Sequence, residues 1–170
     1  MPNVIKRHQY ADYLNVGKPD APEWVLMGVG FTTLNEEPNA QTDTVKYVCD
    51  KASSTSVTGY DTTFPFEAEQ IKEEKAINDI YKIARNHALG SDAERDYLRV
   101  ELWNPGEAEN TFEARKFRVA VAVSEISGEN KMSMSGNLNA VGDPVFGTFN
   151  TKTKTFTESN APADDEQVDP

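Results

Sequence analysis

The sequence has little of what secreted and membrane proteins depend on. It contains a single cysteine, Cys49, so no disulfide can form within the chain and the fold must hold together without covalent cross-links. This use of cysteine fits synthesis in a reducing cytoplasm. No window approaches the roughly 18 consecutive apolar residues of a membrane-spanning helix. The N-terminal stretch MPNVIKRHQYADYL has no apolar h-region, and we therefore expect no secretory signal peptide.

The residues and motifs of common catalytic sites are also scarce. The two histidines are His8, in a mixed polar stretch, and His87, near the end of an expected helix whose dipole favours an imidazole. There is no HExxH, CxxC, GxSxG or P-loop motif. Cys49 has no histidine nearby in the sequence, which favours a small core residue over a nucleophile. We therefore expect no enzyme activity, no cofactor and no metal site.

Positive charge is in short supply. The formal net charge is −11, and the last 13 residues hold five acids and no Lys or Arg. Removing those five from the 28 Asp and Glu leaves 23 acids against 17 bases, a net charge of −6 up to Thr157. High-affinity nucleic-acid binding needs clustered Lys and Arg, which this balance does not favour. Such a surface would instead let nucleic acid pass without adhering.

The first quarter of the chain predicts an arm followed by a hairpin. Residues 1–22 contain three prolines and no clean period, which indicates an extended N-terminal arm. A nearly apolar strand is expected over 24–31, and an alternating strand over 44–48. The polar loop between them, residues 32–43, is longer than ordinary hairpin loops, and such loops are often functional. Residues 24–48 thus predict a hairpin with an extended tip.

The middle of the chain predicts one amphipathic helix, over about residues 72–89. Its apolar residues recur at spacings of three and four, and the set expected to pack on the body is Ile77, Ile80, Tyr81 and Ala84. Gly90 is expected to supply the left-handed stop. Before the helix, residues 57–66 are rich in β-formers, but Gly59 and Pro65 favour an edge or irregular strand.

The second half predicts further β-strands. Residues 97–103 alternate, and so do residues 111–126, in which Phe117, Val119 and Val121 share one face. Strands are also expected over 131–139 and 146–156. The fold class is therefore mainly β, with one flanking helix. We expect a single domain over residues 1–157 and an acidic, disordered tail over 158–170.

Three stretches together resemble the major tail tube proteins of long, non-contractile phage tails. They are WVLMGVGFTTLNEEPNAQTDTVKYVCDK (24–51), VTGYDTTFPFEAEQIKEEKAINDIYKIARNHALGSDAERDYLRVELW (57–103) and MSMSGNLNAVGDPVFGTFNTKTKTFT (132–157). The resemblance covers most of the chain and rests on their sum, because the family has no catalytic signature. The acidic tail departs from it.

The resemblance implies a β-sandwich or barrel-like tail tube fold whose copies form hexameric rings, with the rings stacked into a tube. Its acidic lumen would conduct phage DNA during ejection, without specific binding and without contact with a membrane. The expected partners are other copies of the chain and the tape measure, tail terminator and distal tail proteins. The expected location is the virion tail, after synthesis and assembly in the cytoplasm of the host bacterium.

The resemblance also gives the long loop a role in contacts between rings. The residues expected to make these contacts are Asn35, Glu36, Glu37, Pro38, Asn39 and Gln41. The alternative for the loop is an ordinary flexible connection. The alternative for the whole chain is a stand-alone β-sandwich binding module of a virion, for carbohydrate binding or decoration, with Tyr97 and Trp103 as an exposed aromatic platform.

Overall fold

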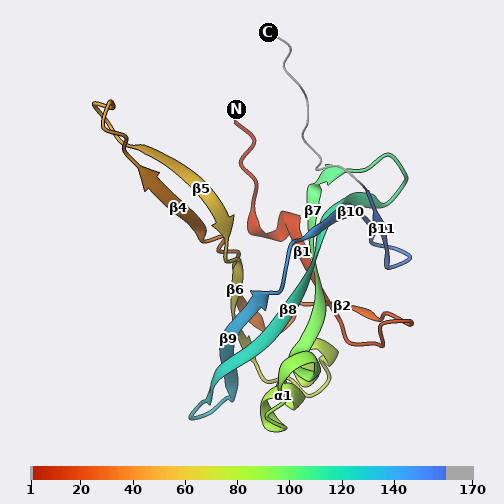
Figure 1. Ribbon diagram of the computed structural model, residues 1–170. Coiled ribbons are helices and arrows are strands. Elements are labelled where there is room, and N and C mark those ends of the chain that lie inside the picture. The colour runs from red at the N-terminus through yellow and green to blue at the C-terminus, as the bar shows by residue number, and fades with distance from the viewer. Residues whose placement is uncertain (1, 160–170) are drawn as a thin grey trace.

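The computed structural model describes residues 2–159, which fold into a curled antiparallel sheet, one helix and a separate projecting hairpin (Figure 1). The mainly β fold class with one flanking helix is therefore confirmed. The elements are η1 (Arg7–Gln9), β1 (Tyr10–Asn15), β2 (Trp24–Leu26), β3 (Phe31–Leu34), β4 (Ala40–Val45), β5 (Ser54–Tyr60), β6 (Thr63–Glu69), α1 (Lys75–Arg85), η2 (Gly90–Ala93), β7 (Glu94–Pro105), β8 (Thr111–Ser127), β9 (Ser133–Ala140), β10 (Val145–Asn150) and β11 (Thr155–Glu158).

The long strand β8 organises the main sheet. The strand order is β2-β1-β7-β8-β9-β6-β3, and β10 pairs with both β8 and β11. The expected alternation in this strand is observed, because Phe117, Val119 and Val121 are all buried. β8 pairs with β9, and Val121 lies opposite Leu138. Alternating burial on one face fixes this register, because a slip of one residue would turn the apolar set to the other face.

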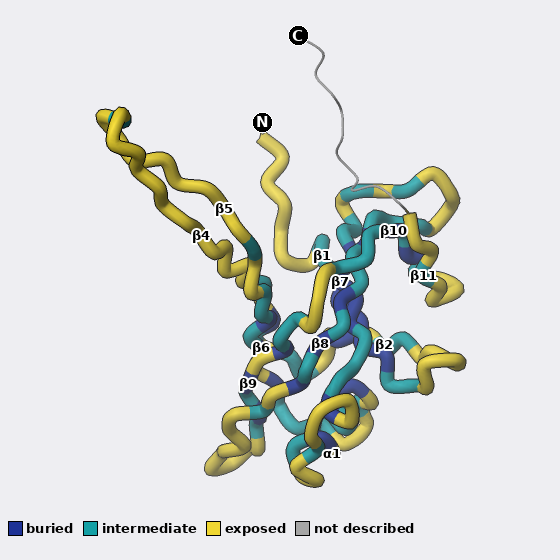
Figure 2. Tube along the Cα trace, in the orientation of Figure 1, coloured by how far each residue is buried: buried dark blue, intermediate teal, exposed yellow. Residues whose placement is uncertain are grey.

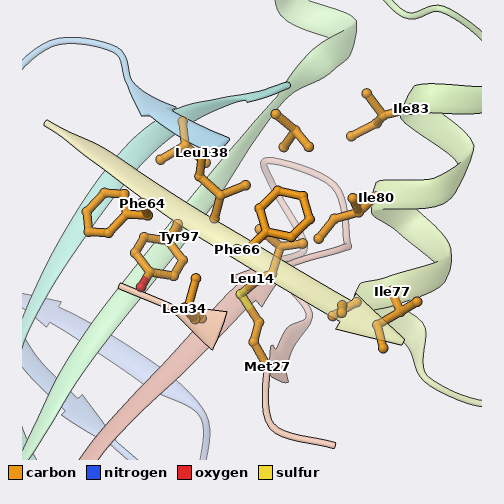
Figure 3. Close-up of a cluster of buried hydrophobic side chains, with 14 of the residues drawn as sticks. Leu14, Met27, Leu34, Phe64, Phe66, Ile77, Ile80, Ile83, Tyr97 and Leu138 are labelled. Carbon is orange, nitrogen blue, oxygen red and sulfur yellow. The ribbon is translucent and has the colours of Figure 1, made fainter. Parts of the chain in front are cut away.

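The helix packs on one face of the sheet and completes the larger core. Ala76, Ile77, Ile80 and Ile83 are buried, and Figure 3 shows the isoleucines facing Phe66, Leu14 and Met27. Of the residues expected to pack, Tyr81 is half-buried against this core and Ala84 is of intermediate exposure. The apolar stripe is thus rotated slightly from the predicted one, toward Ile83. Burying each isoleucine contributes about 2 kcal/mol.

The helix is shorter than expected, and Gly90 does not end it. The backbone N–H of His87 donates to the Ala84 carbonyl at 3.2 Å, and that of Ala88 donates to the Ile83 carbonyl at 3.1 Å. His87 takes the left-handed conformation with φ 49°. This pair of hydrogen bonds is a Schellman ending, in which a histidine replaces the usual glycine. Gly90 instead begins the 3-10 helix η2.

The expected N-terminal arm is wrong over residues 10–15. These residues form β1, which lies between β2 and β7 in the sheet and is buried over nearly its whole length. A strand covered on both faces needs no alternation of apolar and polar residues, which is why no strand periodicity is visible in residues 10–15. Residues 2–8 remain outside the sheet and exposed.

A second, smaller core lies on the opposite face of β7. The strands curl so that Tyr13 of β1 meets Phe149 of β10, with ring centroids 4.7 Å apart. Leu98 and Val100 of β7 are fully buried between them. Tyr97, the neighbour of Leu98, is fully buried in the larger core on the other side. β7 is therefore covered on both faces, and the sheet has the shape of a half-barrel.

A buried polar cluster ties β1 to β7. The Tyr97 hydroxyl donates to Asp12 Oδ1, and Arg99 Nη1 lies 3.3 Å from the same oxygen. Arg7 Nη2 donates to Asp12 Oδ2 at 2.7 Å and to the Leu34 carbonyl at 3.2 Å. Because the Asp12 side chain is only 1% exposed, these donors offset the cost of burying its charge.

Two other expectations need correction at the ends and edges of the sheet. Residues 57–66 do not form one edge strand: they divide between β5 and β6, and β6 lies inside the sheet between β9 and β3. Pro65 fits there because its carbonyl accepts from Asn35 N–H at 3.0 Å, and this contact needs no N–H from proline. β11 reaches Glu158, the first residue of the expected tail. Residues 160–170 of that tail lie outside the described residues.

Candidate functional site

The most prominent surface feature is the hairpin formed by β4 and β5, which projects away from the body (Figures 1 and 2). Its two strands pair only with each other. Every residue of β4 is exposed, as are nearly all of β5. An isolated two-stranded hairpin is marginally stable in water, so a hairpin of this kind gains most from a surface that covers it.

The hairpin exposes apolar side chains that a monomer does not use. Tyr47 and Val48, in the connection between the strands, are 67% and 109% exposed. Val57 and Tyr60 of β5 are 56% and 64% exposed. Apolar side chains gathered on a projecting element mark an interaction surface. Cys49 also lies exposed at this tip, so the expectation of a small core residue is wrong.

The root of the hairpin is held firmly to the body. The Glu36 carboxylate binds Arg115 of β8, with Arg115 Nη2 at 2.5 Å from Oε1 and 3.0 Å from Oε2. The backbones of Glu37 and Thr63 exchange hydrogen bonds of 2.8 and 2.9 Å. The Asn39 amide donates to the Glu37 carbonyl at 3.1 Å and to the Asp61 carbonyl at 3.0 Å. These contacts fix the direction in which the hairpin leaves the body.

The predicted contact residues lie at this root rather than at a tip. Asn35 to Asn39 connect β3 to β4, and Gln41 is the second residue of β4, where its amide donates to the Asn39 carbonyl at 3.1 Å. The predicted return strand over 44–48 is wrong, because β4 covers Ala40–Val45 and pairs with β5 rather than with residues 24–31. Sequence reasoning therefore missed the tip, residues 46–53. The available signal was the β-former run SSTSVTGY, which supplies the true partner strand.

A second candidate surface is the open face of β8, β9 and β6, on the side away from α1. The strand register places small, uncharged side chains in neighbouring rows of this face. They are Ala120, Ala122, Ser133, Ser135, Asn137, Asn139 and Thr63. In one row Ser135 lies between Glu125 of β8 and Glu67 of β6. Arg118 on the same face binds Glu94 at 3.1 Å and Asp96 at 3.2 Å, which neutralises its charge locally.

Residues 2–159 contain no group of three or more His, Cys, Asp or Glu side chains placed to hold a metal ion. Both histidines are exposed, His8 in η1 and His87 beyond the end of α1. Within the same range, no helix has the length and apolarity needed to span a membrane.

The aromatic platform expected for a binding module is absent from the surface. Tyr97 is fully buried, whereas Trp103 is 37% exposed. Trp103 packs edge-on against Tyr10 with a centroid distance of 6.3 Å. The two aromatic residues therefore do not form one exposed face.

Comparison with known proteins identifies the fold but no sequence relatives. No protein-family model matches the chain. No curated protein matches it in sequence. A solved structure that does match is a chain from the tail of an empty GTA (phage-like gene transfer agent) particle with C6 symmetry, at a TM-score of 0.56 and 10% sequence identity. The match covers 84% of this chain and 98% of the other. The chain therefore shares its fold with a protein of a phage-like particle tail.

Proposed function

We propose that this chain is a structural subunit of the tail tube of a phage or phage-like particle. The observation that carries the proposal is the projecting β4–β5 hairpin on a body whose fold matches that of a particle-tail protein. The hairpin is anchored at its root, and β4 and nearly all of β5 are exposed among the described residues. A subunit that must reach a neighbour has a use for such an element, whereas an independent monomer does not.

In this proposal six copies form a ring, and rings stack into a tube. The C6 symmetry of the matching particle tail supports the number six. The short edge strands β2 and β3 end the main sheet and leave backbone groups available for pairing with a neighbour. Pairing of one edge of the sheet with a different edge of the next copy is a heterologous contact. With a suitable rotation between copies such a contact closes into a ring, so that the sheets of neighbouring copies join around one axis.

The open face of β8, β9 and β6 lines the channel in this arrangement. Its small uncharged side chains offer DNA no fixed cations, and Arg118 is already occupied by Glu94 and Asp96. The row of Glu125, Ser135 and Glu67 adds carboxylates that repel phosphates. DNA therefore passes during ejection without adhering to the wall.

The hairpin and its root make the contacts between rings. The root residues take part in these contacts because they set the direction of the hairpin. They are Asn35, Glu36, Glu37, Pro38, Asn39 and Gln41. Other tail proteins (tape measure, terminator and distal tail proteins) bind the same tube at its interior or ends. The role is structural rather than catalytic, and the protein assembles in the host cytoplasm and resides in the virion tail.

A shortened hairpin tests the proposal. Replacing residues 42–58 by Asn-Gly joins the paired residues Gln41 and Gly59 by a tight two-residue turn and removes no buried residue. We expect the full chain to form tubes or stacked rings at high concentration in negative-stain micrographs. The shortened variant should unfold at nearly the same urea concentration but give at most single rings. A matched control, Glu107→Ala in the exposed β7–β8 turn, should assemble normally. Tubes of normal length from the shortened variant would contradict the proposal.

A further inference from the structure

A cleft opens at the root of the hairpin, between that root and the turn that precedes β10. Its volume is about 540 Å³. Its walls include the apolar surfaces of Pro38, Tyr60, Pro144 and Phe146. A cleft of this size accommodates a few side chains. Because its walls are apolar, burial of an aromatic or aliphatic side chain there is favourable.

The rim of the cleft is acidic. Asp61 and Asp143 line it and are exposed. Neither carboxylate has an ion-pair partner within residues 2–159, whereas Glu36, also at the cleft, is neutralised by Arg115. The cleft therefore favours an occupant that combines an apolar side chain with positive charge.

Residues 46–51, within the hairpin tip, have this combination. Lys46 and Lys51 flank the exposed Tyr47 and Val48, and neither lysine makes an ion pair within the part of the chain that the structure describes. Two lysines against Asp50 give the tip a net charge of +1, on a chain whose formal net charge is −11. The carboxylate of Asp50 accepts from the Tyr47 N–H at 3.1 Å, which folds the tip into a defined shape.

The tip of a chain does not reach its own cleft. β4 (Ala40–Val45) runs outward from the root, and its six extended residues alone span about 20 Å. The occupant that fits in charge and shape is therefore the tip of a second copy. Since the tip and the cleft lie at opposite ends of one hairpin, this contact is heterologous and can repeat from each copy to the next along the tube.

We propose that residues 46–51 of one copy dock in the root cleft of another copy, with Tyr47 and Val48 against the apolar walls and the two lysines facing Asp61 and Asp143. The inference rests on the proposed tube function and names the surface that receives the hairpin. Each docked hairpin then lies end to end with the next, and the step between rings is set by the length of the hairpin.

The single native cysteine provides a direct test. Cys49 lies at the tip, so Asp143→Cys places a second thiol at the cleft. Mild oxidation of assembled protein with copper phenanthroline should give a ladder of dimers, trimers and longer species on a non-reducing gel. The control Ser91→Cys puts an exposed thiol in η2 and should give no ladder beyond dimers.

Exchange of charges tests the same contact by a different readout. The double variant Lys46→Glu/Lys51→Glu should raise the concentration needed for assembly at least tenfold. The single variant Asp143→Lys should raise it by as much. Their combination should bring it back to within about threefold of the parent. The control Lys152→Glu, in the exposed β10–β11 turn, should leave it unchanged. Circular dichroism and urea unfolding confirm that each variant is folded.

The outcomes separate this inference from the proposed function. Tubes that form normally but give no ladder from the Asp143→Cys variant, or charge variants that show no recovery when combined, would overturn the docking site alone. A parent chain that stays monomeric at every concentration would overturn the tube function and the docking with it.

Discussion

Arg115 Nη2 lies 2.5 and 3.0 Å from the two carboxylate oxygens of Glu36, a residue 79 positions earlier in the chain. The pair joins the root of the projecting hairpin to β8, the strand around which the sheet is organised. Its side chains are only 27% and 17% exposed, so solvent screens their attraction less than in a surface pair. The direction of the hairpin is therefore set by a contact with the body and not by the hairpin alone.

Loss of this pair should affect assembly more than folding. Glu36→Gln keeps the shape of the side chain but removes its charge, and we expect about 1 kcal/mol less stability in urea unfolding. The concentration needed for tube formation should rise severalfold, because the hairpin samples other directions. The control Glu69→Gln removes a more exposed pair with Lys131 and should change neither quantity measurably. Unchanged assembly by Glu36→Gln would show that the pair does not orient the hairpin.

Gly136 of β9 should not tolerate a side chain. A Cβ built there lies 2.1 Å from the Ala122 carbonyl oxygen of β8, so backbone has to move. We expect Gly136→Ala to cost about 3 kcal/mol in the free energy of unfolding. Gly59→Ala is the matched control, because a Cβ at Gly59 meets nothing within 4 Å. Equal stability of the two variants would contradict the close approach of β8 and β9.

The buried Asp12 should be among the most sensitive polar positions. Asp12→Ala leaves Arg99, which is 7% exposed, without its carboxylate partner and also removes the carboxylate that pairs with Arg7. Removing one member of a buried pair costs about 3–5 kcal/mol, which chemical denaturation measures. Asp20→Ala, at an exposed aspartate, should stay within about 0.5 kcal/mol of the parent. A small effect at Asp12 would mean that the cluster is open to water.

Stability should fall in alkaline solution because of Tyr97. Burial, and next the charge of Asp12, raise the pKa of Tyr97 well above its ordinary value of 10.0. The folded state therefore keeps a proton that the unfolded state loses above about pH 10. The contribution of Tyr97 is complete below that pH and declines above it by about 1.4 kcal/mol per pH unit.

Two phenylalanine variants isolate this contribution in urea unfolding between pH 9 and pH 11. Tyr97→Phe should show a shallower alkaline loss of stability than the parent. Tyr47→Phe, at an exposed tyrosine of the hairpin tip, should follow the parent. Identical slopes for the parent and Tyr97→Phe would contradict the assigned titration.

The sequence predicts those helices and strands that have one buried face and one solvent-exposed face. β8 and β9 alternate because one face packs on the core, and Ile77 and Ile80 recur at helical spacing for the same reason. β1 gave no signal because it is covered on both faces. Tyr97 was misplaced for the same reason, since β7 carries a core on each side.

The candidate site was predictable only in part, because neither face of its hairpin is buried against the body. An exposed strand pair keeps β-forming residues without alternating polarity, so the sequence of 32–43 resembled a polar loop and β4 was not distinguished. The left-handed His87 was missed because the sequence rule assigns that conformation to glycine. The pairing of Glu36 with Arg115 depends on the curl of the sheet, which no local pattern encodes.

Cryo-electron microscopy of the concentrated, full-length protein tests the central claim most directly. We expect stacked rings with six subunits each, with β4 and β5 crossing from every ring to the next. The open face of β8, β9 and β6 should line the channel. Particles without rings, or rings whose hairpins point into solvent and touch no other copy, would contradict the proposed function.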